Sequence, residues 1–502
     1  MYDNGDGVPQ NYSSAMVWYL KAARQGNASA QNSIGVLYRD GKGVPKSNST
    51  AREWFFRAAD QGLADAQFNL GMIYRRENDR SKAAEWFMKA ADQGYTIAQF
   101  GLGAMCYDGW GVPQDFSKAM EWYLRAADKR YARAQFTVGA MYDTGEGVIQ
   151  DYYSASEWYL KAAKQGHSLA QYNLGILYQH GRGVLPNISL AVEWYTKAAD
   201  QGLAQAQHYI GLLYHVGDVI PQDKSKAMEW YLKAGAQGDI DAQFNLGAMY
   251  DEGDGVFQDY LKAAEWYSKA ADQGHALAQY NLGFLHQHGR GVPLDNSSAM
   301  ELYVKAADQG NANALFCLGV MYYHGKDTPQ DDTMAMECYL EAADQRHDAA
   351  QNYVGDMYCD GRGVSQDFVK AIEWYLKSAE QGHASAQNNL GNMYKNGQGV
   401  SQDNQKAMEW YLKAADQGYS IAQNSVGAMY QNGIGVRQDY PTAMEWYMKA
   451  ADQGNPIAQN NIGTMYEDGQ GVHQDYQKAM EWLRKAADQG HADAKIRLEQ
   501  LS

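Results

Sequence analysis

The sequence predicts an all-α fold: a solenoid of about 14 tandem helical hairpins, each 36 residues long. The first observation is a tryptophan series in which every step is a multiple of 36, except one step of 32. Leu302 and Cys338 fill its two missing slots, so the position recurs fourteen times. The second observation is that no segment alternates apolar and polar residues with the period of a β-strand. A fixed period of about 20–50 residues is typical of repeat architectures. The series comprises Trp18, Trp54, Trp86, Trp122, Trp158, Trp194, Trp230, Trp266, Trp374, Trp410, Trp446 and Trp482.

The first half of each repeat reads approximately A-x-A-Q-x-N-L-G-x-M-Y and predicts a helix, called the A helix. Apolar or small residues follow helical spacing, as in Ala242, Leu246 and Met249. A glycine in a helix interior costs about 1 kcal/mol relative to alanine. Its recurrence here therefore predicts that a second helix approaches closely. The recurrent glycines are Gly35, Gly71, Gly103, Gly139, Gly175, Gly211, Gly247, Gly283, Gly319, Gly355, Gly391, Gly427 and Gly463.

A turn and a second helix, the B helix, complete the repeat. Gly253 and Gly255 predict a tight turn, because glycine supplies the positive φ that ends a helix. The B helix carries a stripe of Ala227, Trp230 and Ala234 at 3–4 residue spacing. We interpret the alanines as holes, and the Trp and the aromatic residue after it as knobs. One hairpin cannot bury that surface alone, so neighbouring hairpins must stack.

Two features depart from the period. The step of 32 arises because the segment 75–80 is four residues shorter than its counterparts and lacks their glycines. Trp110 is the one tryptophan outside the series.

Length and charge exclude several classes of protein. The chain has 502 residues, more than a single core usually supports, and a formal net charge of −16. The acidic balance argues against nucleic-acid binding, which needs a basic patch. No apolar run is long enough for a membrane span, and the polar start shows no signal peptide. We expect a cytoplasmic protein, or one of the endoplasmic reticulum or secretory route if a parent chain carries an N-terminal signal.

The repeat resembles the Sel-one-like repeat, a relative of the tetratricopeptide repeat. The resemblance rests, in one copy, on the segment 410–418 followed by Ala422, Gln423, Gly427, Tyr430, Gly433, Gly435 and Val436. It implies a right-handed superhelix of antiparallel αα hairpins and an adaptor or scaffold role. Some members serve protein quality control at the endoplasmic reticulum, some regulate cell-wall synthesis, and a bacterial branch binds or hydrolyses β-lactams. The regular cysteine pairs of that branch are missing here.

The pattern predicts three parts. Residues 1–26 form an incomplete first repeat with only a B helix, residues 27–490 form thirteen tandem repeats, and residues 491–502 form a C-terminal capping helix. The opening Met1-Tyr2-Asp3 matches the end of an A helix, so we expect a fragment whose parent continues N-terminally.

The candidate partner-binding positions lie three residues before the recurrent glycine. In the tetratricopeptide relatives the A helices line a concave groove, and these positions are expected to face it. Asparagine offers a donor and an acceptor together, which suits a peptide backbone, and aromatic rings suit apolar side chains. The alternative is that the aromatic stripe packs between helices. The candidates are Phe68, Phe100, Phe136, Tyr172, Phe244, Tyr280, Phe316, Asn352, Asn388, Asn424 and Asn460.

No residue pattern indicates catalysis, a cofactor or a metal. The G-x-G pairs lack the preceding strand of a nucleotide motif, and the acidic turns lack the full ligand spacing of a calcium loop. Cys317, Cys338 and Cys359 are read as buried thiols and not as a zinc site. We therefore predict a non-enzymatic scaffold that docks protein or peptide partners. Two alternatives stay open: an adaptor subunit of a membrane-linked quality-control or cell-wall complex, and a β-lactam hydrolase.

Overall fold

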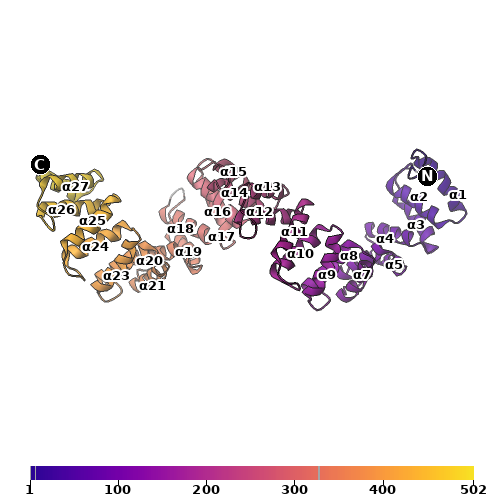
Figure 1. The fold of residues 1–502 in the computed structure, drawn as a ribbon, viewed down its shortest axis with the longest axis horizontal. Coiled ribbons are helices and arrows are strands. Elements are labelled where there is room, and N and C mark those ends of the chain that lie inside the picture. Colours follow the sequence, from indigo (N-terminus) through magenta and orange to yellow (C-terminus); the bar gives the residue numbers. More distant parts are fainter. Residues whose placement is uncertain (1, 6, 326–327, 502) are drawn as a thin grey trace. The chain divides into compact units, whose positions relative to one another are not determined.

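The computed structural model describes residues 2–5, 7–325 and 328–501, and these residues form 28 α-helices and no β-strand. Consecutive helices pair as hairpins along the chain (Figure 1). The chain divides into two compact units, Met1–Ala242 and Gln243–Ser502, and each is described by itself. The predicted all-α architecture of paired helices is confirmed. Within the described ranges, no helix combines the length and apolar character needed to cross a bilayer.

Odd-numbered helices before the unit boundary are B helices and even-numbered ones are A helices. The first unit contains α1 (Tyr12–Arg24), α2 (Ala28–Asp40), α3 (Asn48–Asp60), α4 (Ala64–Arg76), α5 (Arg80–Asp92), α6 (Thr96–Asp108), α7 (Phe116–Asp128), α8 (Ala132–Thr144), α9 (Tyr152–Lys164), α10 (Ser168–His180), α11 (Ile188–Asp200), α12 (Ala204–Val216) and α13 (Lys224–Ala236). Helix α14 (Ile240–Glu252) includes the boundary.

The same alternation continues in the second unit. It contains α15 (Tyr260–Asp272), α16 (Ala276–His288), α17 (Asn296–Ala307), α18 (Ala312–His324), α19 (Asp332–Asp344), α20 (Asp348–Asp360), α21 (Phe368–Glu380), α22 (Ala384–Asn396), α23 (Asn404–Asp416), α24 (Ser420–Asn432), α25 (Tyr440–Asp452), α26 (Pro456–Asp468), α27 (Tyr476–Asp488) and α28 (Ala492–Leu501).

The two glycines of the A–B turn have different tasks. Gly433 ends α24 in the left-handed conformation at φ 62°, as the sequence predicts. Gly471 is also left-handed, at φ 71°, but it additionally meets the preceding B helix. A Cβ placed on Gly471 would lie 2.5 Å from the Cβ of Tyr440, the first residue of α25. The second glycine therefore allows one turn to touch the helix before it.

The glycine inside each A helix from α2 to α24 receives an aromatic ring of the same hairpin, whereas Gly463 of α26 receives Leu483. A Cβ on Gly427 would lie 2.7 Å from the ring of Tyr447, which is fully buried. The same relationship joins Gly103 to Tyr123. The predicted close approach of the two helices is thus confirmed, and the ring that fills the notch is the one that follows the tryptophan.

The periodic tryptophans pack against the preceding B helix as well as against their own hairpin. Trp446 of α25 lies against a buried cluster formed by α23 and α24. Trp18, which has no B helix before it in this chain, is 59% exposed, whereas Trp86 is 8% exposed. A lysine covers the outer face of the indole, with Lys377 Nζ 3.5 Å from the ring centroid of Trp374. Cation–π contact therefore caps the joint between hairpins.

Buried glutamines link most A helices to the B helices on both sides. Gln423 of α24 donates from Nε2 to the carbonyl of Ala415 in α23 at 3.2 Å. Its Oε1 accepts from Nε2 of Gln453, which caps α25, at 2.8 Å. A buried amide needs such partners, because a buried donor or acceptor without a hydrogen bond lowers the free energy of unfolding. The pairs that repeat this bond are Gln31–Gln61, Gln67–Gln93, Gln135–Gln165, Gln171–Gln201, Gln207–Gln237, Gln243–Gln273, Gln279–Gln309, Gln351–Gln381, Gln387–Gln417 and Gln459–Gln489.

Candidate partner-binding surface

One strip of each A helix stays accessible after the hairpins have packed. In α6 it runs through Ile97, Gly101, Ala104 and Asp108, which follow one another at 3–4 residue spacing and are exposed or half-buried. The helix faces that lie between these positions are closed by the B helices. We call this surface the exposed strip.

The exposed strip carries apolar side chains at its first position in both units. They are between 41% and 49% exposed, which is unusual for isoleucine and leucine. They are Ile97, Leu169, Leu277, Ile421 and Ile457. The sequence reasoning missed them. The same position is polar in other repeats, such as Asp65, Arg133 and Ser385. A position that is polar in those repeats is not a core position, and this is the signal in the sequence that the apolar residues there are exposed.

The aromatic candidates lie at the edge of the strip and are half-buried. They are Phe68, Phe100, Phe136, Tyr172, Phe244, Tyr280 and Phe316. Each packs on the buried aromatic ring of its own hairpin, as Phe136 does on Tyr159 with centroids 5.8 Å apart. Several also stack on the residue that caps the next A helix, and Phe136 lies 4.7 Å from His167. Packing between repeats is therefore their first role, and only an edge of each ring is accessible.

The asparagine candidates are mostly buried, so their expected exposure is wrong for three of four. Asn352, Asn388 and Asn460 are 4%, 5% and 9% exposed, and Asn424 is half-buried. The physical reason is helix phase: the neighbouring position, one residue later, faces outward. Asn389 occupies it and donates from Nδ2 to Oδ1 of Asn352 at 3.2 Å.

These amides connect consecutive A helices. Asn461 donates to Oδ1 of Asn424 at 3.0 Å in the same way as Asn389 does to Asn352. The Oδ1 atoms of Asn388 and Asn460 are buried without a hydrogen-bond partner among the described residues. The amide series is thus an element of the joint between repeats, with two open acceptors.

A half-buried carboxylate departs from the pattern in α20. Asp356 follows the helix glycine, where most repeats carry an apolar residue. It accepts from the hydroxyl of Tyr375 at 2.8 Å and from the amides of Asn352 and Asn389 at 3.0 and 3.1 Å. Burial raises the pKa of Asp356 to about 6, and nearby Asp360 adds to the increase.

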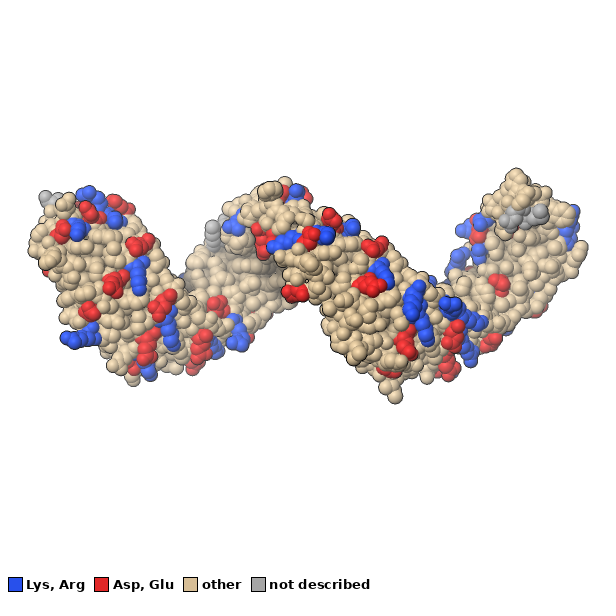
Figure 2. Space-filling view, in the orientation of Figure 1, with Lys and Arg blue, Asp and Glu red and all other residues tan. Residues whose placement is uncertain are grey.

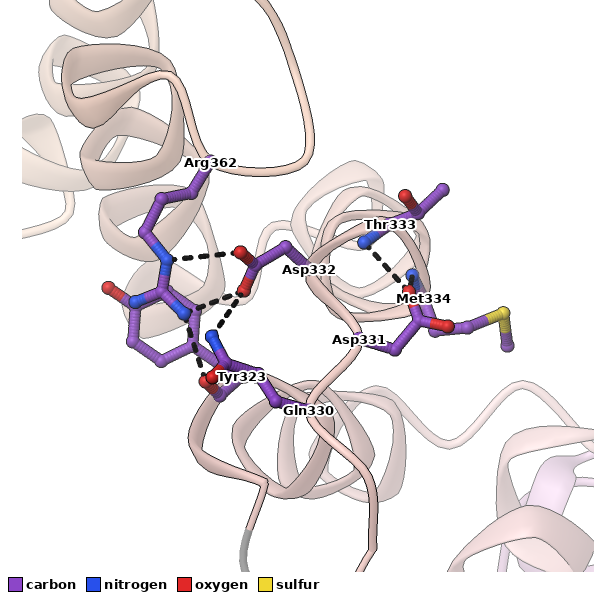
Figure 3. Close-up of polar contacts among 7 residues, drawn as sticks. All are labelled: Tyr323, Gln330, Asp331, Asp332, Thr333, Met334 and Arg362. Atoms are coloured by element: carbon purple, nitrogen blue, oxygen red, sulfur yellow. Dashed lines mark hydrogen bonds and ion pairs between the residues drawn. The ribbon is translucent and has the colours of Figure 1, made fainter.

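An arginine ties two repeats together in the second unit. Figure 3 shows Arg362, from the turn after α20, reaching Asp332 at the start of α19 and the carbonyl of Tyr323 at the end of α18. Its Nη2 atom lies 2.6 Å from Oδ1 of Asp332, and its guanidinium carbon lies 3.6 Å from the ring centroid of Tyr323. The hydrogen bond from Arg362 lowers the pKa of Asp332. The contact connects two successive turns, and the charge of Arg362 is paired with that of Asp332.

Charge on the surface is mixed. On the face shown in Figure 2, acidic and basic side chains alternate and are separated by wide uncharged areas. Within the described part of the chain, no group of three or more His, Cys, Asp or Glu side chains is arranged to hold a metal ion. All four cysteines are free, and Cys106 and Cys338 are buried. On the exposed strip, the side chains available to a partner are mainly apolar groups and amides.

Comparison with known families gives one match along almost the whole chain. The model of the Sel1 repeat matches fourteen consecutive segments: residues 1–27, 28–63, 64–95, 96–131, 132–167, 168–203, 204–239, 240–275, 276–311, 312–347, 348–383, 384–419, 420–455 and 456–491. A comparison with curated protein sequences found no match.

Solved structures of similar proteins cover most of the chain. One is c5321, a protective antigen of uropathogenic Escherichia coli strains with an SLR fold, at 32% identity and a TM-score of 0.74, with 97% of each chain covered. Another is a Sel1 repeat protein from Oxalobacter formigenes, at 35% identity and a TM-score of 0.51, with 62% of this chain and 90% of that chain covered.

Proposed function

The chain belongs to the Sel1 repeat family, and we propose that it is a non-enzymatic scaffold that docks partner proteins or peptides along the exposed strips of its A helices. Repeat proteins of this kind generally serve protein interaction. The family fixes the fold more firmly than the function, so the proposal rests on the surface itself.

The observation that supports the proposal is a set of exposed apolar side chains on the A helices. Ile97, Leu169, Leu277, Ile421 and Ile457 stand at one repeat position, and each exposes more than two fifths of its surface. Of these five, Ile421 and Ile457 belong to successive A helices, α24 and α26, and neighbouring exposed apolar side chains mark an interaction surface better than single ones do. Half-buried aromatic edges beside them add contact area that a partner can cover.

The test is affinity capture by the full chain followed by cross-linking and mass spectrometry. The strip variant carries Ile97→Ser, Leu169→Ser, Leu277→Ser, Ile421→Ser and Ile457→Ser. The matched control changes equally apolar residues at the tips of the A–B turns, Ile149→Ser, Leu185→Ser and Phe257→Ser, which are almost fully exposed. We expect the strip variant to lose the captured partners and the control to retain them. Partners that survive in the strip variant but not in the control would place docking on the turns and refute the proposal.

A further inference from the structure

Three departures from the repeat pattern meet at one pocket in the first unit. The A–B turn between α4 and α5 consists of residues 77–79 alone, whereas residues 41–47 separate α2 from α3. Trp110, the tryptophan outside the period, lies beside it with Gly101 of α6 and Arg75 of α4. They line a pocket of about 290 Å³. Independent deviations that converge in space indicate a specific site and not drift of single positions.

The short turn explains why the pocket exists. Asn78 replaces the glycine of other turns and adopts a left-handed φ of 60°. The missing residues leave the next turn uncovered, and Trp110 occupies that space between Gly109 and Gly111. The floor is open because Gly101 bears no side chain: a Cβ placed there would meet no atom within 4 Å. Other A helices carry Asn69, Thr137 or Asn173 at this position.

Two cationic groups lie against Trp110: Arg75 lines the pocket, and Arg80 lies beside the indole but is not one of the lining residues. The guanidinium carbons of Arg75 and Arg80 each lie 5.8 Å from the ring centroid of Trp110. Both side chains are exposed, and Arg80 makes only a 3.4 Å hydrogen bond to Asn78. No ion pair with either arginine occurs among the described residues. Asp108 is the acidic residue of the lining.

The basic character extends to the preceding repeat. Arg39 stands one repeat before Arg75. It forms an ion pair with Asp40 at 2.7 Å, and its Nη1 donates to Oδ1 of Asn69 at 3.0 Å. Asn69 in turn donates to Asn32 at 3.0 Å, so α2 and α4 share a polar row that leads to the pocket. Residues 39–82 contain nine Lys and Arg against six Asp and Glu, in a chain whose net charge is −16. The local sign is thus opposite to that of the molecule.

We propose that this pocket binds an Asp or Glu side chain of an extended acidic peptide segment in a partner. Arginine forks match carboxylate oxygens, and the bond is stronger when both groups are charged. The indole face of Trp110 keeps both guanidinium groups in place and covers the stem of the bound side chain. The inference rests on the proposed scaffold function and adds the chemistry of one partner segment to it.

The test uses fluorescence anisotropy of a fluorescein-labelled peptide of alternating Glu and Gly, with the full chain as receptor. We expect the Glu peptide to bind and its Gln and Lys counterparts to bind at least about tenfold more weakly. Arg75→Ala with Arg80→Ala should raise the Kd about tenfold or more. The matched control is Arg125→Ala, which removes an arginine 4.3 Å from the ring of Trp122 on a B helix and should leave the Kd unchanged.

Asp108→Asn gives an independent readout with the opposite sign. Removal of this carboxylate should tighten binding of the Glu peptide severalfold, because a like charge leaves the site. Equal Kd values for the double arginine variant and the wild type, or equal binding of the Glu and Gln peptides, would overturn the inference. So would a single-stranded oligonucleotide that displaces the peptide and binds more tightly. If the Glu peptide fails while partner cross-links to the exposed strips persist, the inference is wrong and the scaffold function stands.

Discussion

Gln423 and Gln453 are joined by a hydrogen bond of 2.8 Å between Oε1 and Nε2, and the same bond recurs along both units. Since Gln423 also reaches the carbonyl of Ala415, one side chain holds three successive helices together. The repeat at α6 lacks this bond. Oε1 of Gln99 is buried without a partner, and Lys129 stands where the donor glutamine is expected.

Lys129→Gln should therefore stabilise the joint between α6 and α7. A restored hydrogen bond to a buried acceptor contributes about 1 kcal/mol. Hydrogen–deuterium exchange of the α6 and α7 amides measures the change locally, which matters because long repeat arrays need not unfold in one step. Gln165→Lys is the control with the opposite sign, since it removes the existing bond to Gln135. Faster exchange in Lys129→Gln would contradict the account.

Gly101 and Gly103, two residues apart in α6, should respond oppositely to alanine. Gly103→Ala forces a Cβ to within 2.7 Å of the Tyr123 ring, and such overpacking costs about 1–3 kcal/mol. Gly101→Ala meets open space and should stabilise the helix by about 0.5–1 kcal/mol. Urea unfolding monitored by circular dichroism measures both. A stabilising effect of both changes would show that helix propensity, and not the ring contact, decides the outcome.

Histidine caps should make the fold less stable in mild acid. The neutral imidazoles of His167, His347 and His383 accept backbone N–H groups at the starts of α10, α20 and α22. Burial lowers the pKa of all three. As the pH falls through about 6.5, the unfolded chain takes up protons that the folded chain resists, so stability is lost.

The three histidines changed together to asparagine isolate this effect. Asparagine caps the same position elsewhere in the chain, as Asn311 and Asn455 do. We expect the melting temperature of the wild type to fall more than that of the variant between about pH 7 and about pH 5. If the melting temperatures of the wild type and the variant fell in parallel with pH, the histidine caps would not be the cause of the lost stability.

Asp356 should act in the opposite direction. Its folded-state pKa of about 6 lies above the unfolded value, so its contribution to stability is full at low pH and is lost as the pH rises through the folded pKa. Asp356→Asn should therefore be more stable than the wild type at neutral pH, by about 1–3 kcal/mol, and about equal near pH 4. Melting temperatures at a series of pH values test this. A constant difference at all pH values would mean that packing, and not ionisation, is what changed.

The regular part of the structure could be predicted from residue periodicity because it repeats the same contacts. The glycine of α24 and the ring of Tyr447 each recur once per period, so a close approach between their helices followed from the sequence. The identity of the buried ring was less secure, because Trp446 and Tyr447 are adjacent and both are large. The structure shows that the tyrosine fills its own hairpin, while the tryptophan reaches the preceding one.

The accessible surface was harder to predict, because a shift of one residue along a helix changes the face on which a side chain lies. Asn388 and Asn389 have identical chemistry, and a helix rotates by about 100° between them, so the pattern alone did not tell which faces outward. The exposed apolar residues such as Ile97 and Ile457 were not predicted, because most repeats place polar or small residues at that position. The pocket beside Trp110 required tertiary structure, since Arg75 and Trp110 meet only after the shortened turn has brought two repeats together.

Each glycine pair and each glutamine bond connects a hairpin only to its immediate neighbours, and most copies carry both halves of the contact. A duplicated stretch of DNA that encodes 36 residues would therefore insert without disturbing what lies on either side. The length of such a molecule is consequently open to change during evolution.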